Sequence, residues 1–170
     1  MRTLLVLVIL AVLVLALLYT YRGRGRRRPR LPMLAPFPLP PAELSGPEGA
    51  ELLPPAIGPY AGTTMAGDWY DKVNIGDFGQ ETTATLHLSR AGLLIDRVNA
   101  SPLWIPAESI RSARIGKAIA GKVMTTDGLL VITWQLGGRL LDTAFNGQDK
   151  DAYADWLYAL GQLKAGEEAV

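Results

Sequence analysis

The chain has 170 residues, no cysteine and a formal net charge of +1, with 17 Lys/Arg against 16 Asp/Glu. The lack of cysteine excludes disulfide frameworks, thiolate metal sites and cysteine nucleophiles. The charge is unevenly distributed: the residues through Arg30 carry seven arginines and no acid, and the remainder carries ten Lys/Arg against sixteen Asp/Glu. The part after Arg30 is therefore acidic, which argues against a basic nucleic-acid-binding surface there.

The first element in the chain is an uncharged run rich in Leu and Val, from Thr3 to Tyr21. Its nineteen residues would rise about 28 Å as a helix, close to the thickness of a bilayer's hydrocarbon core. Six arginines follow it: Arg22, Arg24, Arg26, Arg27, Arg28 and Arg30. We therefore predict a single transmembrane helix over residues 1–21 in the cell (inner) membrane, with the N-terminus outside and the rest cytoplasmic.

Other interpretations of this segment fit less well. A secretory signal peptide carries its positive charge before the apolar run and a small-residue cleavage site after it, whereas here the charge follows. A buried helix of a soluble domain would need a polar face, which the run lacks. The arginines could contact nucleic acid, but a block beside a spanning helix is more simply explained by topology and contact with anionic lipid. We expect no nucleic-acid partner.

Residues 22–58 are predicted to form an Arg-rich and then Pro-rich linker. Ten of the twelve prolines lie between Pro29 and Pro59, and they remove backbone donors and favour extended conformations. The segment from Pro36 to Pro41 could be a ligand for an aromatic-groove module, or a spacer between membrane and domain. We favour the spacer.

From Pro59 the pattern changes to short strands. Alternation of apolar and polar residues and intervening turn residues predict strands at 60–66, 83–88, 93–98, 103–105, 110–115, 130–136 and 139–145. A C-terminal amphipathic helix follows, with its apolar stripe on Tyr153, Trp156, Leu157, Leu160 and Leu163. We therefore predict a mainly β domain over residues 59–165, an orthogonal sandwich or partly open barrel of seven strands capped by one helix, and a tail over 166–170.

This arrangement resembles the pleckstrin-homology-like (PH-like) fold, with Trp156 on the buried stripe of the helix. The stretches Leu103–Pro106, Ile110–Ile115 and 127–134 resemble the bacterial branch of that superfamily. The layout of one span and then this domain looks like small actinobacterial membrane proteins described as PH-like or export-related. These similarities lie in hydrophobic patterns, so they imply a fold and leave the activity open.

The PH fold is best known for binding phosphoinositide headgroups through basic residues after the first strand. Here residues 67–81 hold four acids and one lysine, so we expect no phosphoinositide binding. Trp69, Tyr70 and Phe78 in this loop could contact the membrane interface or a protein partner. They could equally plug the open end of the sheet, which we slightly favour.

Lys117 and Lys122 form a weak candidate for a phosphate-binding loop. Gly116 and Gly121 with Lys122 match part of a Walker spacing, but Val123 occupies the position of the hydroxyl that would bind magnesium. No helix is predicted after this segment. We therefore expect a hairpin loop.

The remaining polar residues do not form a catalytic set. The one histidine, His87, falls on the polar side of its strand, and we interpret Asp96 beside Arg97, and Asp142, as cross-strand surface pairs. An enzyme needs convergent polar groups in a pocket. We expect no enzymatic activity, no cofactor and no metal site.

Together these features predict a membrane-anchored, non-catalytic module that binds or scaffolds proteins on the cytoplasmic face. Its partner would dock on an open sheet edge or on the loop around Trp69 and Phe78. Two alternatives stay open: an accessory subunit of a transporter or export complex, and a lipid-interacting sensor.

Overall fold

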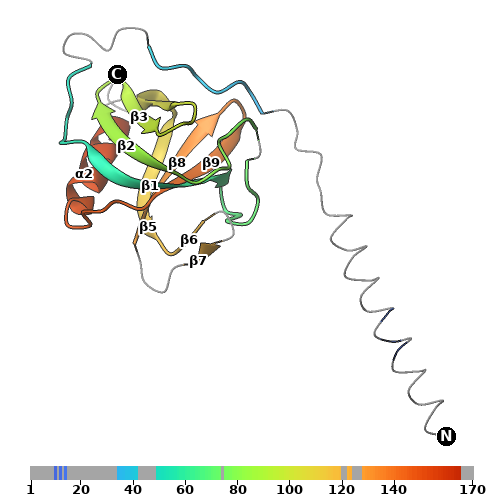
Figure 1. The fold of residues 1–170 in the computed structure, drawn as a ribbon. Coiled ribbons are helices and arrows are strands. Elements are labelled where there is room, and N and C mark those ends of the chain that lie inside the picture. Colours follow the sequence, from blue (N-terminus) through green and yellow to red (C-terminus); the bar gives the residue numbers. More distant parts are fainter. Residues whose placement is uncertain are drawn as a thin grey trace, which may run out of the picture. The chain divides into compact units, whose positions relative to one another are not determined.

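A computed structural model describes residues 10, 12, 14, 34–41, 49–73, 75–119, 122–123 and 128–165 (Figure 1). The chain divides into two compact units, Met1–Leu34 and Ala35–Val170. The second unit therefore includes part of the segment for which the sequence predicts a linker. The sheet, the helix and the candidate sites described below lie in this second unit.

The second unit is built mainly of antiparallel strands. Seven of them form one sheet in the order β4-β3-β2-β1-β9-β8-β5. Its members are β1 (Ala56–Met65), β2 (Thr82–Ser89), β3 (Gly92–Arg97), β4 (Leu103–Pro106), β5 (Ile110–Gly116), β8 (Leu129–Leu136) and β9 (Arg139–Phe145). A two-stranded hairpin, β6 (Ala118–Ile119) with β7 (Lys122–Val123), a short 3-10 helix, η1 (Ala107–Ser109), and α2 (Tyr153–Ala165) complete it. The predicted seven antiparallel strands and one C-terminal helix are confirmed.

The predicted transmembrane helix over Thr3–Tyr21 is the part of the fold prediction that needs correction. Among the described residues, no helix is both long and apolar enough to cross a membrane. Only Leu10, Val12 and Val14 of that run belong to the described residues, and the six arginines from Arg22 to Arg30 lie outside them. The prediction depended on the length of the apolar run and on the arginines that follow it. These two properties describe how a segment partitions into a bilayer, and they do not determine which structure the segment forms.

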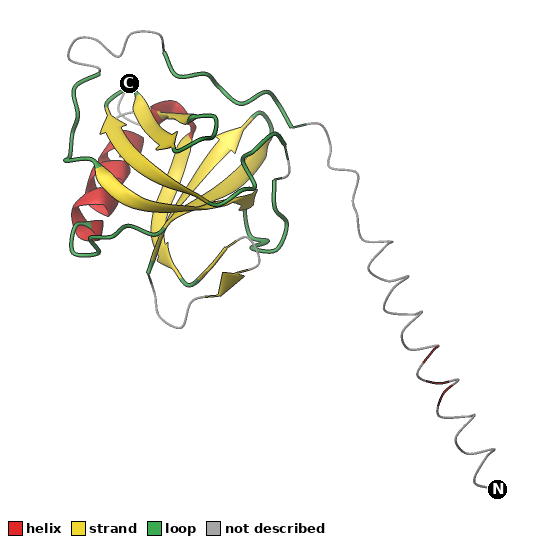
Figure 2. Ribbon diagram, viewed as in Figure 1, coloured by secondary structure: helices red, strands yellow, loops and turns green. Residues whose placement is uncertain are grey.

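The strands curve around a common apolar interior, with α2 packed against β5 and η1 (Figure 2). Alternation in β2 buries Ala84, Leu86 and Leu88, as the sequence predicts. On α2, Trp156 and Leu160 are buried, so the helix closes one side of this interior. Each buried leucine among these side chains stabilises the fold by about 1.5–3 kcal/mol.

A chain of hydrogen bonds crosses the interior and joins three strands to the loop after β1. Trp134 Nε1 donates to Thr143 Oγ1 (2.9 Å), which lies 2.8 Å from Thr63 Oγ1. Thr63 Oγ1 is 2.7 Å from the hydroxyl of Tyr60, and that hydroxyl donates to the carbonyl of Phe78 (2.6 Å). Trp134, Thr143, Thr63 and Tyr60 are all fully buried.

The number of protons fixes the direction of this chain. The carbonyl of Phe78 can only accept, so Tyr60 uses its one proton there and must accept from Thr63. Thr63 in turn accepts from Thr143, and Thr143 accepts from the indole of Trp134, which can only donate. Each polar group of this hydrogen-bonded series is thereby satisfied, which avoids a penalty of about 1–3 kcal/mol for each unpaired buried group.

We expect the alkaline unfolding of the domain to depend on Tyr60. Burial raises the pKa of Tyr60 from its ordinary value of 10.0 to about 12, against smaller opposing effects of Thr63 and Arg97. The protonated phenol therefore contributes stability that is complete below pH 10.0 and is lost as the pH rises through about 12. Two pKa units correspond to about 3 kcal/mol.

Thermal unfolding across this pH range checks the prediction. Tyr60→Phe should be less stable than the parent chain at neutral pH, because it leaves the Phe78 carbonyl without its donor, and should lose less stability as the pH rises. Tyr158→Phe removes a hydroxyl from a side chain that is 71% exposed, and should behave as the parent does. An alkaline loss in Tyr60→Phe equal to that of the parent would contradict the assignment.

Candidate functional site

The loop between β1 and β2, residues 66–81, folds back along the end of β1. Its first part is held by backbone hydrogen bonds from Met65 N to the Asp71 carbonyl (3.0 Å) and from Val73 N to the Thr63 carbonyl (2.9 Å). Val73, within the loop, is fully buried. These contacts fix the base of the loop on β1.

A buried arginine holds the second part of the loop. Arg97, at the end of β3, is only 3% exposed. Its guanidinium forms an ion pair with the carboxylate of Asp77 and donates to the Asp77 carbonyl (3.0 Å), and its Nε donates to the Ser101 carbonyl (2.8 Å). From the sequence, Asp96 and Arg97 are expected to form a surface pair. That interpretation is wrong for Arg97, because the partner that balances its buried charge is Asp77.

The pKa of Asp77 reflects this arrangement. Partial burial opposes its ionisation, but the backbone amide of Ser101 (2.7 Å) and the guanidinium of Arg97 outweigh that effect and hold its pKa below the ordinary value of 3.8. Asp77 therefore carries its charge at neutral pH. Because Arg97 balances it, the net acidity near the loop tip comes from other residues.

Aromatic rings surround the guanidinium of Arg97. Its Cζ lies 4.9 Å from the centre of the Tyr60 ring and 4.7 Å from that of Phe78. The ring of Phe78 also stacks on Phe37, with 3.9 Å between centres and 18° between planes. Phe78 is therefore a plug at the end of the sheet, which is one of the two alternatives that the sequence leaves open.

Trp69 and Tyr70 occupy a different position from Phe78. They are 40% and 69% exposed, and their rings meet edge to face with 4.8 Å between centres. The Tyr70 amide donates to Asp68 Oδ1 (3.0 Å), which orders the turn that carries the pair. We call Trp69 and Tyr70 the exposed aromatic pair. The three loop aromatics that the sequence groups together thus divide into this pair and one plug.

Residues 117–123 contain the hairpin β6–β7 that the sequence leads us to expect. Ile119 in β6 is buried in a small apolar cluster on strands β1, β8 and β9, formed with Ala61, Leu129, Val131 and Ala144. This gives the hairpin a packing role. Nothing in the structure tests the weak phosphate-loop candidate at Lys117 and Lys122. The element that follows the hairpin is β8, a strand.

The other candidate polar residues lie in ion pairs. Asp142 accepts from Arg114 Nη2 (2.9 Å) across the sheet and from the Thr133 hydroxyl (2.6 Å). His87 Nδ1 lies 2.7 Å from Glu51 Oε1 in an exposed pair. Within the described part of the chain, no group of three or more Asp, Glu and His side chains could hold a metal ion.

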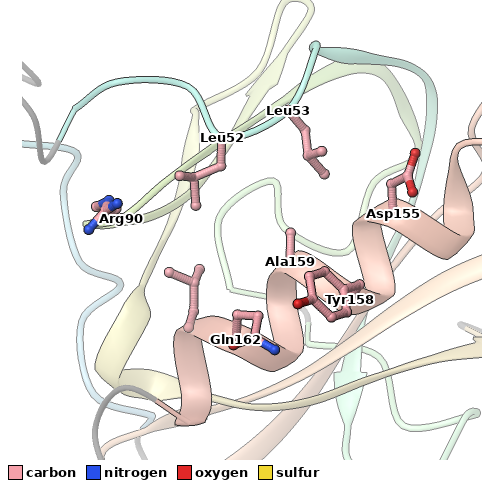
Figure 3. Close-up of a pocket in the computed structure, with 8 residues that line it drawn as sticks. Leu52, Leu53, Arg90, Asp155, Tyr158, Ala159 and Gln162 are labelled. Atoms are coloured by element: carbon pink, nitrogen blue, oxygen red, sulfur yellow. The ribbon is translucent and has the colours of Figure 1, made fainter.

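A groove that no sequence pattern predicts runs along α2. Figure 3 shows Leu52 and Leu53 opposite the side chains of the helix. The groove has a volume of about 700 Å³ and is lined by Leu52, Leu53, Arg90, Asp155, Tyr158, Ala159, Gln162 and Leu163. Leu52 and Leu53, near the end of the predicted linker, are the residues that could have indicated this groove. They lie about a hundred residues before α2 in the chain, so no local pattern shows that they face this helix.

We expect the loop to depend on the ion pair between Asp77 and Arg97. Asp77→Asn leaves the buried guanidinium without a balancing charge, which costs about 3–5 kcal/mol. Because the folded pKa of Asp77 lies below 3.8, its contribution is present above that pH and is lost as the pH falls through the folded pKa. Urea unfolding should therefore show a large loss for Asp77→Asn at neutral pH and a smaller one in acid.

Asp96→Asn provides the matched control, because Asp96 is an exposed carboxylate on the same strand as Arg97. Its stability should stay within about 0.5 kcal/mol of the parent. Similar losses in the two variants would contradict the specific role of Asp77.

A comparison with curated proteins gives no match to this sequence. A comparison with family models gives a match to the model described as bacterial PH domain-like, over residues 34–161. The match spans the whole seven-stranded sheet and most of α2, and it begins within the Pro-rich segment that carries Phe37. The chain therefore belongs to the bacterial PH domain-like family.

Proposed function

We propose that the domain is a non-catalytic interaction module that contacts a protein partner through its exposed aromatic pair. The observation that carries this proposal is that Trp69 and Tyr70 pack on each other and remain exposed. The other tryptophans of the domain, Trp104, Trp134 and Trp156, are buried, and Tyr158 on α2 is exposed without an aromatic partner that packs on it in the described part of the chain. Membership of a PH-like family suits an interaction role, although the fold alone does not fix it.

The energetics of binding favour such a pair. Trp and Tyr are the residues that most often dominate binding energy at protein interfaces. The loop that carries them is fixed at its base by Val73 and by the ion pair of Asp77, so little conformational entropy is lost when a partner binds. Preorganised aromatic side chains thus provide a compact docking point.

The charge around the pair indicates the chemistry of the partner. Asp68 and Asp71 flank it, and Asp77 is already balanced by Arg97. Carboxylates beside the pair favour a partner surface with Lys or Arg side chains. They disfavour anionic lipid, so a protein partner is preferred over the lipid-sensor alternative. A polytopic transporter or export protein with basic cytoplasmic loops would satisfy the same requirement.

Site-specific photo-crosslinking in cells of the source organism tests this proposal. A photoreactive phenylalanine in place of Tyr70 in the full chain should give a discrete adduct, whose mass and peptide fragments identify a protein. Adding Trp69→Ala should reduce the yield about tenfold or more, because it removes the neighbouring half of the pair. A photoreactive residue in place of Val98, which is 56% exposed and lies outside the loop, is the control and should give no such adduct.

The same experiment can contradict the proposal. An adduct formed only when the photoreactive residue replaces Tyr158 would place the partner in the groove along α2. Lipid adducts at Tyr70 without a protein would instead support the lipid-sensor alternative.

We further propose that the domain works at the cytoplasmic face of the inner membrane. Support for this location comes from the sequence, because anionic lipid attracts clustered basic residues by about 1 kcal/mol each. The cluster consists of Arg22, Arg24, Arg26, Arg27, Arg28 and Arg30.

Reporter fusions at Val170, combined with cell fractionation, test this location. A fusion to a reporter that requires the cytoplasm should show reporter activity, and this fusion should be recovered with the membrane fraction. A reporter that is active only in the periplasm should be silent. Activity of the periplasmic reporter alone would contradict the cytoplasmic placement.

A further inference from the structure

A small polar pocket lies on the face of the sheet that points away from the interior hydrogen-bond chain. Thr63 and Thr64 are consecutive in β1, so their side chains point to opposite faces of the sheet. Thr63 joins the interior chain, and Thr64 lines the pocket. The pocket has a volume of about 290 Å³, and its lining includes Thr64, Trp69, Arg114, Lys117, Ile119 and Asp142. We call it the Thr64 pocket.

The buried hydroxyl of Thr64 is the observation that points to a ligand. Thr64 is 0% exposed, yet within the described part of the chain no group forms a hydrogen bond with its Oγ1. An unpartnered buried hydroxyl destabilises the folded protein, whereas an apolar group of the same shape would not. A ligand atom that accepts a hydrogen bond from Thr64 removes this penalty. The pocket therefore contains a binding group that the fold itself does not use.

The charged groups beside Thr64 suit a single negative charge. Arg114 Nη2 donates to Asp142 Oδ2 (2.9 Å), and the Thr133 hydroxyl donates to the other carboxylate oxygen (2.6 Å). The guanidinium of Arg114 has further N–H donors for a ligand, and its side chain is 51% exposed. Asp142 next to it opposes a second negative charge. A carboxylate is therefore favoured over a phosphate monoester, which carries about −1.5 to −2 charges at neutral pH.

The position of Arg114 is fixed before a ligand binds. A Cβ atom at Gly116 would lie 3.0 Å from Arg114 Nη1 and 2.9 Å from Val131 Cγ2. Only glycine at this position leaves the guanidinium its present place, between Gly116 and its partner Asp142. A preorganised donor of this kind loses little entropy when a ligand binds.

The remaining wall of the pocket is apolar and aromatic. Trp69 from the loop after β1 and Ile119 from β6 border it, and β6 packs against β1 (Figure 1). The acids that flank Trp69, Asp68 and Asp71, are not among its lining residues. The volume of about 290 Å³ lies at the lower end of the range for small-molecule sites, about 300–1,000 Å³. The pocket thus combines a charged floor with an aromatic side wall at the size of a small ligand.

We propose that the Thr64 pocket binds a small aromatic monocarboxylate. Its carboxylate accepts hydrogen bonds from the Thr64 hydroxyl and from Arg114, and its ring packs on Trp69. This site goes beyond the proposed function, because a free small molecule and not a protein is its occupant. The experiments below change neither Trp69 nor Tyr70, so the two proposals can fail independently.

Titration of benzoate into the ¹⁵N-labelled full chain, followed by NMR, tests the proposal. The indole N–H of Trp69 and the amides around the pocket should shift in a saturable manner. Thr64→Val keeps the shape of the side chain and removes the hydroxyl, and it should weaken benzoate binding about tenfold or more. Benzamide has the same ring without the charge, and it should bind the parent chain about tenfold more weakly than benzoate.

Thr82→Val is the matched control. Among the described residues, Thr82 Oγ1 is also buried without a hydrogen-bond partner, but Thr82 does not line the pocket. Without ligand, both variants should unfold at the temperature of the parent or above it, because each removes an unpartnered buried hydroxyl. Only Thr64→Val should lose benzoate binding. A lower unfolding temperature for Thr64→Val would contradict the inference, because it would show that the hydroxyl already has a structural partner.

A second pair of variants tests the role of the guanidinium. Arg114→Lys keeps the positive charge and loses the planar set of donors, so it should weaken benzoate binding about threefold or more. Arg111→Lys makes the same change on the same strand, at a side chain that donates to Gln135 and does not line the pocket. This control should bind benzoate as the parent does.

Several results would overturn the inference. The absence of saturable shifts at millimolar benzoate would do so, as would equal affinities of the parent chain and Thr64→Val for benzoate. Tighter binding of inorganic phosphate than of benzoate would overturn the assignment to a monocarboxylate.

Discussion

The buried guanidinium of Arg97 is the constraint on which the loop after β1 and its aromatic residues depend. A full positive charge removed from water must be balanced and hydrogen-bonded, because an uncompensated one costs several kcal/mol. Arg97 meets this requirement with the carboxylate and carbonyl of Asp77 and with the carbonyl of Ser101. If the loop after β1 moved away from the end of β3, the charge of Arg97 would become exposed to water or would stay buried without the carboxylate of Asp77 to balance it.

Tyr60 connects this charge to the interior. Its ring lies against the guanidinium of Arg97, and its hydroxyl continues the hydrogen-bonded chain from the strands to the carbonyl of Phe78. The position of Phe78 is thus determined twice, through its backbone and through its ring. One rigid construction supports both the exposed aromatic pair at the loop tip and the ring of Phe78, on which Phe37 packs.

Local sequence patterns predict the parts of this fold that depend on periodicity. Alternation in β2, the turn at Gly137 and the apolar stripe of α2 all follow from residues close together in the chain. The burial of Arg97 and the different positions of the three loop aromatics do not follow from such local patterns. They depend on which distant segment supplies a partner, and Asp77 is no different from its acidic neighbours until the strands bring it to β3. For the same reason a Pro-rich stretch that suggests a spacer contains Phe37, whose packing on Phe78 has no local signature.

The single direction of the interior hydrogen-bond chain also limits how this sequence can evolve. One end is an indole N–H that can only donate and the other is a carbonyl that can only accept. Thr143→Val would leave the indole N–H of Trp134 without an acceptor. Thr63→Val would remove the hydroxyl that hydrogen-bonds to both Tyr60 and Thr143. These positions cannot drift toward an apolar core one at a time. Homologous domains should therefore retain the whole polar set or replace it together.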